Sequence, residues 1–146
     1  MQTYSSAYNQ NAVTTGGQLR REQAVSLMAL GVALWLLFAL LIRHVMPTGW
    51  FASPTISVLL FAACVPSGWL MVRLCQRAAA LKPEQLVPGV AIASAAALPC
   101  DGVALTWAPQ LYGADAASIL PAAAWLFWGA GVCLALAFVM AGRKAA

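Results

Sequence analysis

Four long stretches of apolar residues dominate the chain, at about residues 24–46, 55–77, 86–108 and 118–141. Their apolar positions are continuous, which is typical of membrane-spanning helices and not of the alternating strands of a membrane barrel. A span needs about 20 mostly apolar residues at about 1.5 Å per residue, and each stretch meets that length. Because the linkers are short, consecutive spans are expected to be antiparallel neighbours. The pattern therefore predicts an all-α integral membrane protein, an antiparallel four-helix bundle.

The polar residues outside these stretches are concentrated at the beginning of the chain. Residues 1–23 are rich in Gln, Asn, Ser, Thr and Gly, so we predict a flexible polar tail there, followed by a four-span domain over residues 24–146. The first apolar stretch has full spanning length and no clear cleavage site follows it. We therefore interpret it as an uncleaved span and not as a signal peptide.

Composition agrees with a membrane environment. The 146 residues are 62% hydrophobic and 8% charged, whereas soluble domains carry about 25% charged residues. Soluble domains of this size bury only about 60–70% of their surface. A soluble fold would therefore leave a large apolar surface exposed to water.

Seven of the eight Lys and Arg residues fall on one side of the four-span topology. They are Arg20, Arg21, Arg73, Arg77, Lys82, Arg143 and Lys144. Only Arg43 lies on the other side, where Trp50, Trp107 and Tyr112 map to the outer interface that aromatic rings prefer. Basic residues near spans are retained in the cytoplasm, so both termini are expected to be cytoplasmic. The net charge of +4 thus reflects topology and contact with lipid head groups, and we exclude nucleic acid as a partner.

Asp101 is the most informative polar residue because it falls inside the third span, about 10 Å below its outer end by helix rise. A carboxylate at that depth costs a few kcal/mol unless it is neutral, paired or hydrated. Gly89, Ala93 and Ala97 recur with it every four residues and form one stripe of small residues. We therefore expect Asp101 to point into the bundle.

Arg43 is the candidate partner of Asp101 because it lies near the outer end of the first span. It shares a four-residue stripe with Gly31, Trp35 and Ala39. The adjacent His44 points about 100° away on the helix. An Asp101–Arg43 pair would fix helix packing, which is the interpretation we favour. The alternatives are a site for a proton, an ion or a substrate, and a contact of Asp101 with another protein.

Two prolines interrupt spans at similar depth, Pro66 in the second and Pro99 in the third. A proline removes one helical hydrogen bond and bends the helix. Two such breaks can open a small polar cavity, as in the discontinuous helices of transporters. The simpler interpretation, which we favour, is that prolines are frequent in membrane helices.

Trp125 and Trp128 lie in the fourth span at about the depth of Asp101. Aromatic residues at helical spacing usually pack in a core, but rings in a cavity can also stack on a ligand or a lipid tail. With Pro66, Pro99 and His44, these tryptophans are the candidate residues that line a cavity.

No catalytic residue, metal ligand or cofactor is predicted. The four cysteines form no Cys-x-x-Cys motif and there is a single histidine, which disfavours a zinc site, thiol redox chemistry and two-histidine haem ligation. No nucleotide-binding loop, nucleophile elbow or pair of carboxylates occurs. The sequence therefore favours a protein that is not an enzyme.

The second half of the chain has an ordered set of Pro, Gly, Asp and Trp positions. These are Pro88-Gly89, Leu98-Pro99 with Asp101-Gly102, residues 109–113, and residues 123–129 with Gly131. The set resembles a family of small four-span bacterial membrane proteins of unknown function, in which a Pro-Gly opens the third span, an Asp lies within it and a Trp-rich fourth span follows. The resemblance implies the four-span fold and a bacterial inner membrane, and it implies no activity. Asp101 and Trp125 fall on its motif positions.

The leading hypothesis is a non-catalytic accessory or assembly subunit that packs against a larger membrane complex. It rests on the small size, the stripes of small residues and the lack of a reaction centre. The expected partners are membrane lipids and other membrane protein subunits. One alternative is a small transporter or proton-coupled carrier with its site at Asp101. Another is lipid or quinone binding between the third and fourth spans.

Overall fold

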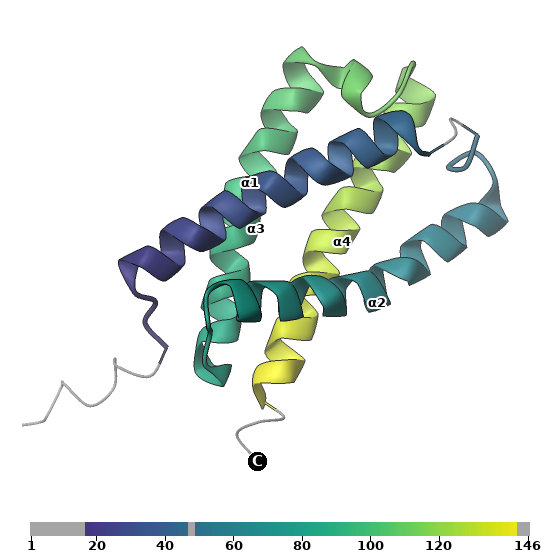
Figure 1. Ribbon diagram of the computed structural model, residues 1–146. Coiled ribbons are helices and arrows are strands. Elements are labelled where there is room, and N and C mark those ends of the chain that lie inside the picture. The colour runs from purple at the N-terminus through teal and green to yellow at the C-terminus, as the bar shows by residue number, and fades with distance from the viewer. Residues whose placement is uncertain (1–16, 47–48, 143–146) are drawn as a thin grey trace, which may run out of the picture.

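The computed structural model describes residues 17–46 and 49–142, which form four long helices joined by short connections (Figure 1). The elements in chain order are α1 (Arg21–His44), α2 (Pro54–Ala78), the single-turn 3-10 helix η2 (Pro83–Gln85), α3 (Leu86–Trp107), a second single-turn 3-10 helix η3 (Pro109–Leu111) and α4 (Ala116–Gly142). Each of the four long helices is long and apolar enough to cross a membrane. The predicted all-α four-helix bundle of candidate membrane spans is confirmed.

Short local motifs set the ends of these helices. Pro54 begins α2, where its fixed φ fits a first helical position and its missing N–H costs nothing. Beyond the end of α2, Ala80 turns the chain with a left-handed φ of 48°. Asp115 precedes α4, and its Oδ1 accepts a hydrogen bond from the Ser118 backbone N–H at 2.9 Å. Asp115 therefore caps the N-terminus of α4.

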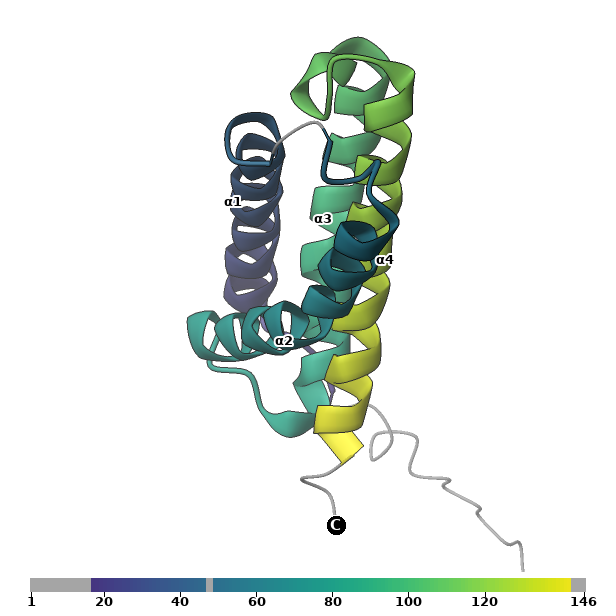
Figure 2. The same cartoon turned by 90° about the vertical axis from the view of Figure 1, so that its right-hand side faces the viewer.

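The helices cross in two pairs. Figure 1 shows α1 and α2 crossing in front of α3 and α4, and Figure 2 shows α1 and α4 on opposite sides with α3 between them. The most extensive contacts join α1 to α3 and α2 to α4, whereas α1 and α2 contact each other little. Consecutive helices do run in opposite directions, but the closest partners are helices that run in the same direction. The expectation that consecutive spans are neighbours is therefore corrected for α1 and α2, which contact each other little.

Small residues account for this pairing. Where α1 crosses α3, a Cβ atom built on Gly31 would overlap the carbonyl oxygen of Ala93 and lie 2.9 Å from its carbonyl carbon. Where α2 meets α4, a Cβ atom on Gly68 would lie 3.2 Å from side-chain atoms of Val132 and Leu136. Small residues let helix backbones approach this closely without an intervening side chain. The predicted stripes through Gly31 and Ala93 are thus the contact faces of α1 and α3.

Hydrogen bonds from two glutamine side chains join the elements at the end where the basic residues lie, here called the basic end. The buried Gln23 donates from Nε2 to the Ala79 carbonyl oxygen at 2.9 Å. Gln85 donates from Nε2 to the Gln18 carbonyl oxygen at 2.7 Å. Five of the seven residues of the predicted basic side are described and lie at this end: Arg20, Arg21, Arg73, Arg77 and Lys82.

Parts of the predicted organisation lie outside the described residues. Residues 1–16 of the predicted polar tail (1–23) and the basic residues Arg143 and Lys144 belong to these parts. The described remainder of the tail contributes the first turn of α1 and the Gln18 carbonyl that Gln85 binds.

The buried core consists of two clusters. The cluster near the basic end is built around Leu27, Val72 and Leu86. The outer cluster is built around Ala39, Cys64, Tyr112, Ala122 and Trp125, near the α3–α4 connection. A cavity that is lined by all four helices lies between the two clusters.

We predict that Gly31→Ala separates α1 from α3 and lowers the free energy of unfolding by about 1–3 kcal/mol, the usual cost of forcing an atom into a packed contact. Equilibrium unfolding in mixed micelles measures this change. Gly131→Ala is the matched control, because a Cβ atom there meets nothing within 4 Å. That control is expected to be neutral or stabilising by up to about 1 kcal/mol. Equal effects of the two substitutions would contradict the close crossing.

Candidate functional site

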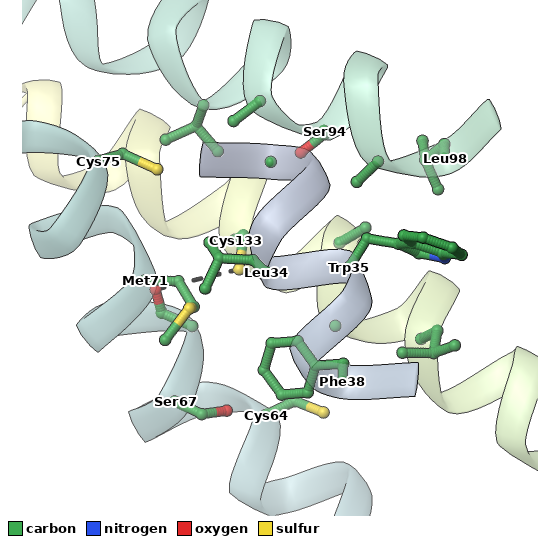
Figure 3. Close-up of a pocket in the computed structure, with 18 of the residues that line it drawn as sticks. Leu34, Trp35, Phe38, Cys64, Ser67, Met71, Cys75, Ser94, Leu98 and Cys133 are labelled. Carbon is green, nitrogen blue, oxygen red and sulfur yellow. Dashed lines mark hydrogen bonds between the residues drawn. The ribbon is translucent and has the colours of Figure 1, made fainter. Parts of the chain in front are cut away.

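A cavity of about 140 Å³ lies at the centre of the bundle and is lined by all four helices. Figure 3 shows Leu34 and Phe38 of α1 on the side of Ser67 and Met71 of α2, and the Trp35 ring on the other side of α1. Its walls are mostly apolar, with polar groups from Asp101, Trp35, Ser67 and Ser94. An engineered apolar cavity of about 150 Å³ holds a benzene molecule. The space is therefore sufficient for about one six-membered ring.

Asp101 lies at the outer side of this cavity and is held by two neutral donors. The Tyr112 hydroxyl donates to Asp101 Oδ1 at 2.6 Å, and Trp35 Nε1–H donates to the same oxygen at 3.0 Å. The indole N–H also approaches the Tyr112 hydroxyl oxygen at 3.1 Å. Asp101 is 5% exposed, so the prediction that it points into the bundle is confirmed. The three side chains join α1, α3 and the outer connection.

The structure does not bring Arg43 and Asp101 together. The Arg43 guanidinium lies exposed and donates to the Gln110 carbonyl oxygen at 3.0 Å. Asp101 lies at the level of Trp35, and Arg43 is eight residues further along α1, which is about 12 Å by helix rise. Within the described residues the expected ion pair is therefore replaced by the hydrogen bonds of Trp35 and Tyr112.

Tyr112 occupies a different place from the one that the sequence predicted. Trp50 and Trp107 are exposed, as expected for interfacial rings, but Tyr112 is 2% exposed and belongs to the outer core cluster. The single turn of η3 reverses the chain after α3 and brings Tyr112 back over the bundle. Burial, and next the hydrogen bond to Asp101, raise the pKa of Tyr112 well above its usual value.

Trp125 and Trp128 tie α4 to α2. Trp125 Nε1–H donates to the Leu60 carbonyl oxygen at 3.0 Å, and Trp128 Nε1–H donates to the Phe61 carbonyl oxygen at 3.2 Å. These carbonyls neighbour that of Ala62, which has no helical donor because Pro66 lacks an N–H. Trp125 is buried and lines the central cavity, whereas Trp128 is half exposed. Of the two tryptophans, Trp125 is the one with access to a ligand there.

The remaining predicted lining residues lie away from the central cavity. Pro66 and Pro99 are exposed, and α2 and α3 continue through them. His44 is exposed and lines a second hollow at the outer end, together with Arg43, Gln110 and Tyr112. The helix breaks therefore do not form the cavity, which lies where the two pairs of helices cross.

Three of the four thiols line the cavity, those of Cys64, Cys75 and Cys133. All three are free thiols. Within residues 17–46 and 49–142, no three His, Cys, Asp or Glu side chains lie close enough together to hold a metal ion. The thiols therefore act as small apolar wall residues in this structure.

Comparison of the chain with protein-family models, curated proteins and solved structures gave no match. The fold and the candidate spans define a small four-span membrane protein. The resemblance to a bacterial four-span family stays a prediction.

We predict that Tyr112→Phe lowers the free energy of unfolding by about 1–3 kcal/mol, because it removes the hydroxyl that donates a hydrogen bond to the buried carboxyl group of Asp101. Thr106→Val is the control, since its exposed hydroxyl donates to Gly102 O within the same helix. Its removal is expected to change stability by less than about 0.5 kcal/mol. Equal losses in the two variants would contradict a specific role of Tyr112.

The same variant has a distinct pH dependence. Unfolded tyrosine ionises near pH 10, whereas folded Tyr112 holds its proton to higher pH. The stabilisation that the protonated Tyr112 hydroxyl gives to the folded state is therefore fully present below about pH 10 and is lost as the pH rises further. Wild-type stability should fall more steeply than that of Tyr112→Phe between pH 10 and 11 in unfolding titrations.

Proposed function

We propose that this four-span membrane protein is a non-catalytic carrier or binding protein that takes a small lipophilic molecule into its central cavity. The observation that carries the proposal is the partly open cavity of about 140 Å³, lined by all four helices, with the carboxyl group of Asp101 on its wall. This develops the alternative of a carrier with an intramembrane aspartate. A bacterial inner membrane with both termini in the cytoplasm is part of the proposal, supported by the described basic residues at one end.

The size of the cavity favours a binding role over a defect in packing. Protein interiors contain few voids larger than a water molecule. The cavity is only partly enclosed, and its walls keep short side chains at Ala97 and Gly129, where a single larger side chain would fill it. A space kept open in this way supports occupation by a ligand.

The arrangement of the helices supports entry from the lipid. The cavity wall includes residues of both α1 and α2, and these two helices contact each other little. Leu34 and Phe38 of α1 and Ser67 and Met71 of α2 are partly exposed along this side (Figure 3). A lipophilic molecule dissolved in the bilayer would therefore reach the cavity between α1 and α2.

We predict that Ala97→Phe fills the cavity and weakens the binding of toluene at least about tenfold, a loss of about 1.4 kcal/mol or more. The measurement is saturable binding of tritiated toluene to protein in lipid nanodiscs, with protein-free nanodiscs subtracted. Ala95→Phe is the matched control because Ala95 is on the same helix but exposed. Equal effects of the two variants, or a wild type that saturably binds neither toluene nor a one-ring compound with a polar group, would refute the proposed function.

The accessory-subunit hypothesis is retained as a second candidate because one face of α3 is made of small exposed residues. These are Ala91, Ala95, Pro99 and Gly102. A Cβ atom on Gly102 would meet nothing within 4 Å. Small residues at helical spacing are typical of contacts between membrane helices, so this face is suited to a helix of another subunit.

The second candidate predicts the opposite response of the same two variants. In blue native electrophoresis of mildly solubilised membranes, wild type and Ala97→Phe would migrate with a larger complex. Ala95→Phe would run at the mass of the isolated protein, because its side chain blocks close helix contact. Migration of the wild type alone, as a monomer or small homo-oligomer, would count against an accessory role.

A further inference from the structure

The hydrogen bonds to Asp101 converge on one of its two carboxyl oxygens. Tyr112 and Trp35 both donate to Oδ1, and no side chain in the described part of the chain donates to Oδ2. Every fully covered side-chain nitrogen or oxygen among the described residues has a partner. Because Oδ2 has none, it keeps some accessible surface, and Asp101 lines the central cavity. One carboxyl oxygen is therefore available to a molecule in that cavity.

The protein supplies no positive charge to this carboxyl group within the described residues. The residues that line the cavity include no Lys, Arg or His. Arg43, the nearest candidate by sequence, donates to the Gln110 carbonyl oxygen instead. A carboxyl group at this depth needs either a proton or a cation. A cationic ligand would provide the positive charge that the lining residues do not supply.

The walls of the cavity suit an organic cation better than a metal ion. Trp35, Phe38 and Trp125 line the cavity, and the Phe38 and Trp125 rings lie edge to face with their centroids 6.0 Å apart. Aromatic faces attract ammonium groups and also accommodate apolar bodies. Metal ions of the magnesium and calcium type instead need several oxygen ligands, and Asp101 is the only carboxyl group among the lining residues.

We propose that the ligand is a small lipophilic amine, bound as its ammonium form, with the nitrogen at Asp101 Oδ2 and an apolar body of about one ring in the cavity. This rests on the proposed function and names the ligand class of the same site. Benzylamine has the required size, by comparison with the benzene that a cavity of about 150 Å³ holds. Toluene and benzyl alcohol share its ring and differ at the polar group.

The test compares tritiated benzylamine, benzyl alcohol and toluene in phosphatidylcholine nanodiscs, with protein-free nanodiscs subtracted. On the wild type we expect benzylamine to bind at least about tenfold more tightly than toluene, since a charge-assisted hydrogen bond contributes about 1.5–3 kcal/mol. Benzyl alcohol should bind with intermediate affinity. In Asp101→Asn, which keeps an oxygen for Trp35 and Tyr112, benzylamine should bind no better than toluene.

Asp115→Asn is the matched control. It removes the same charge from an exposed acid outside the cavity, and asparagine is an equally good helix cap. The preference for benzylamine should be unchanged in this variant. A loss of the preference in both variants would show a general effect of charge and would overturn the assignment of Asp101.

The outcomes separate the two proposals. Equal affinities of the wild type for benzylamine and toluene would overturn the amine assignment and leave the proposed function intact. If the wild type binds none of the three compounds saturably, both the amine assignment and the proposed function are refuted. These comparisons on the wild type do not depend on whether Asp101→Asn folds.

Discussion

The direct contact between the backbones of α1 and α3 is the constraint on which the rest of the structure depends. Gly31 meets the carbonyl group of Ala93 with no side chain between the helices. In lipid, helices are held together by close packing and not by the removal of apolar surface from water. A contact of this kind fixes the register of the two helices. It thereby places Trp35, one turn beyond Gly31, beside Asp101 on the neighbouring helix.

That register explains why neutral donors and not an arginine hold the buried carboxyl group. Trp35 and Tyr112 reach Asp101 from α1 and from the outer connection. Arg43 lies two turns further out on α1, where its charge stays in the exposed region of the outer end. Bringing the guanidinium down to Asp101 would remove a second charge from water at considerable cost. Neutral donors satisfy one oxygen without that cost and leave the other accessible.

The features that could be predicted from the sequence are those that depend on helical periodicity. The four spans, the inward direction of Asp101 and the small-residue faces through Gly31 and Ala93 all follow from spacing along one helix. Spacing does not say which helix meets which face, so the pairing of α1 with α3 could not be predicted. Tyr112 was misplaced for a related reason. An aromatic residue beyond a span resembles an interfacial anchor, and only the turn at η3 brings it inward.

The central cavity and the tight crossing have a common origin in this packing. Small residues let α1 and α3 touch at Gly31 and Ala93, and the helices of the two pairs diverge beyond that point. At that level the walls include Ala97, Gly129 and Ala130, whose side chains are too short to fill the space. The aromatic rings of Trp35, Phe38 and Trp125 also line the cavity and are fixed by their own contacts. The open space is therefore set by rigid neighbours, and a ligand can occupy it without repacking the bundle.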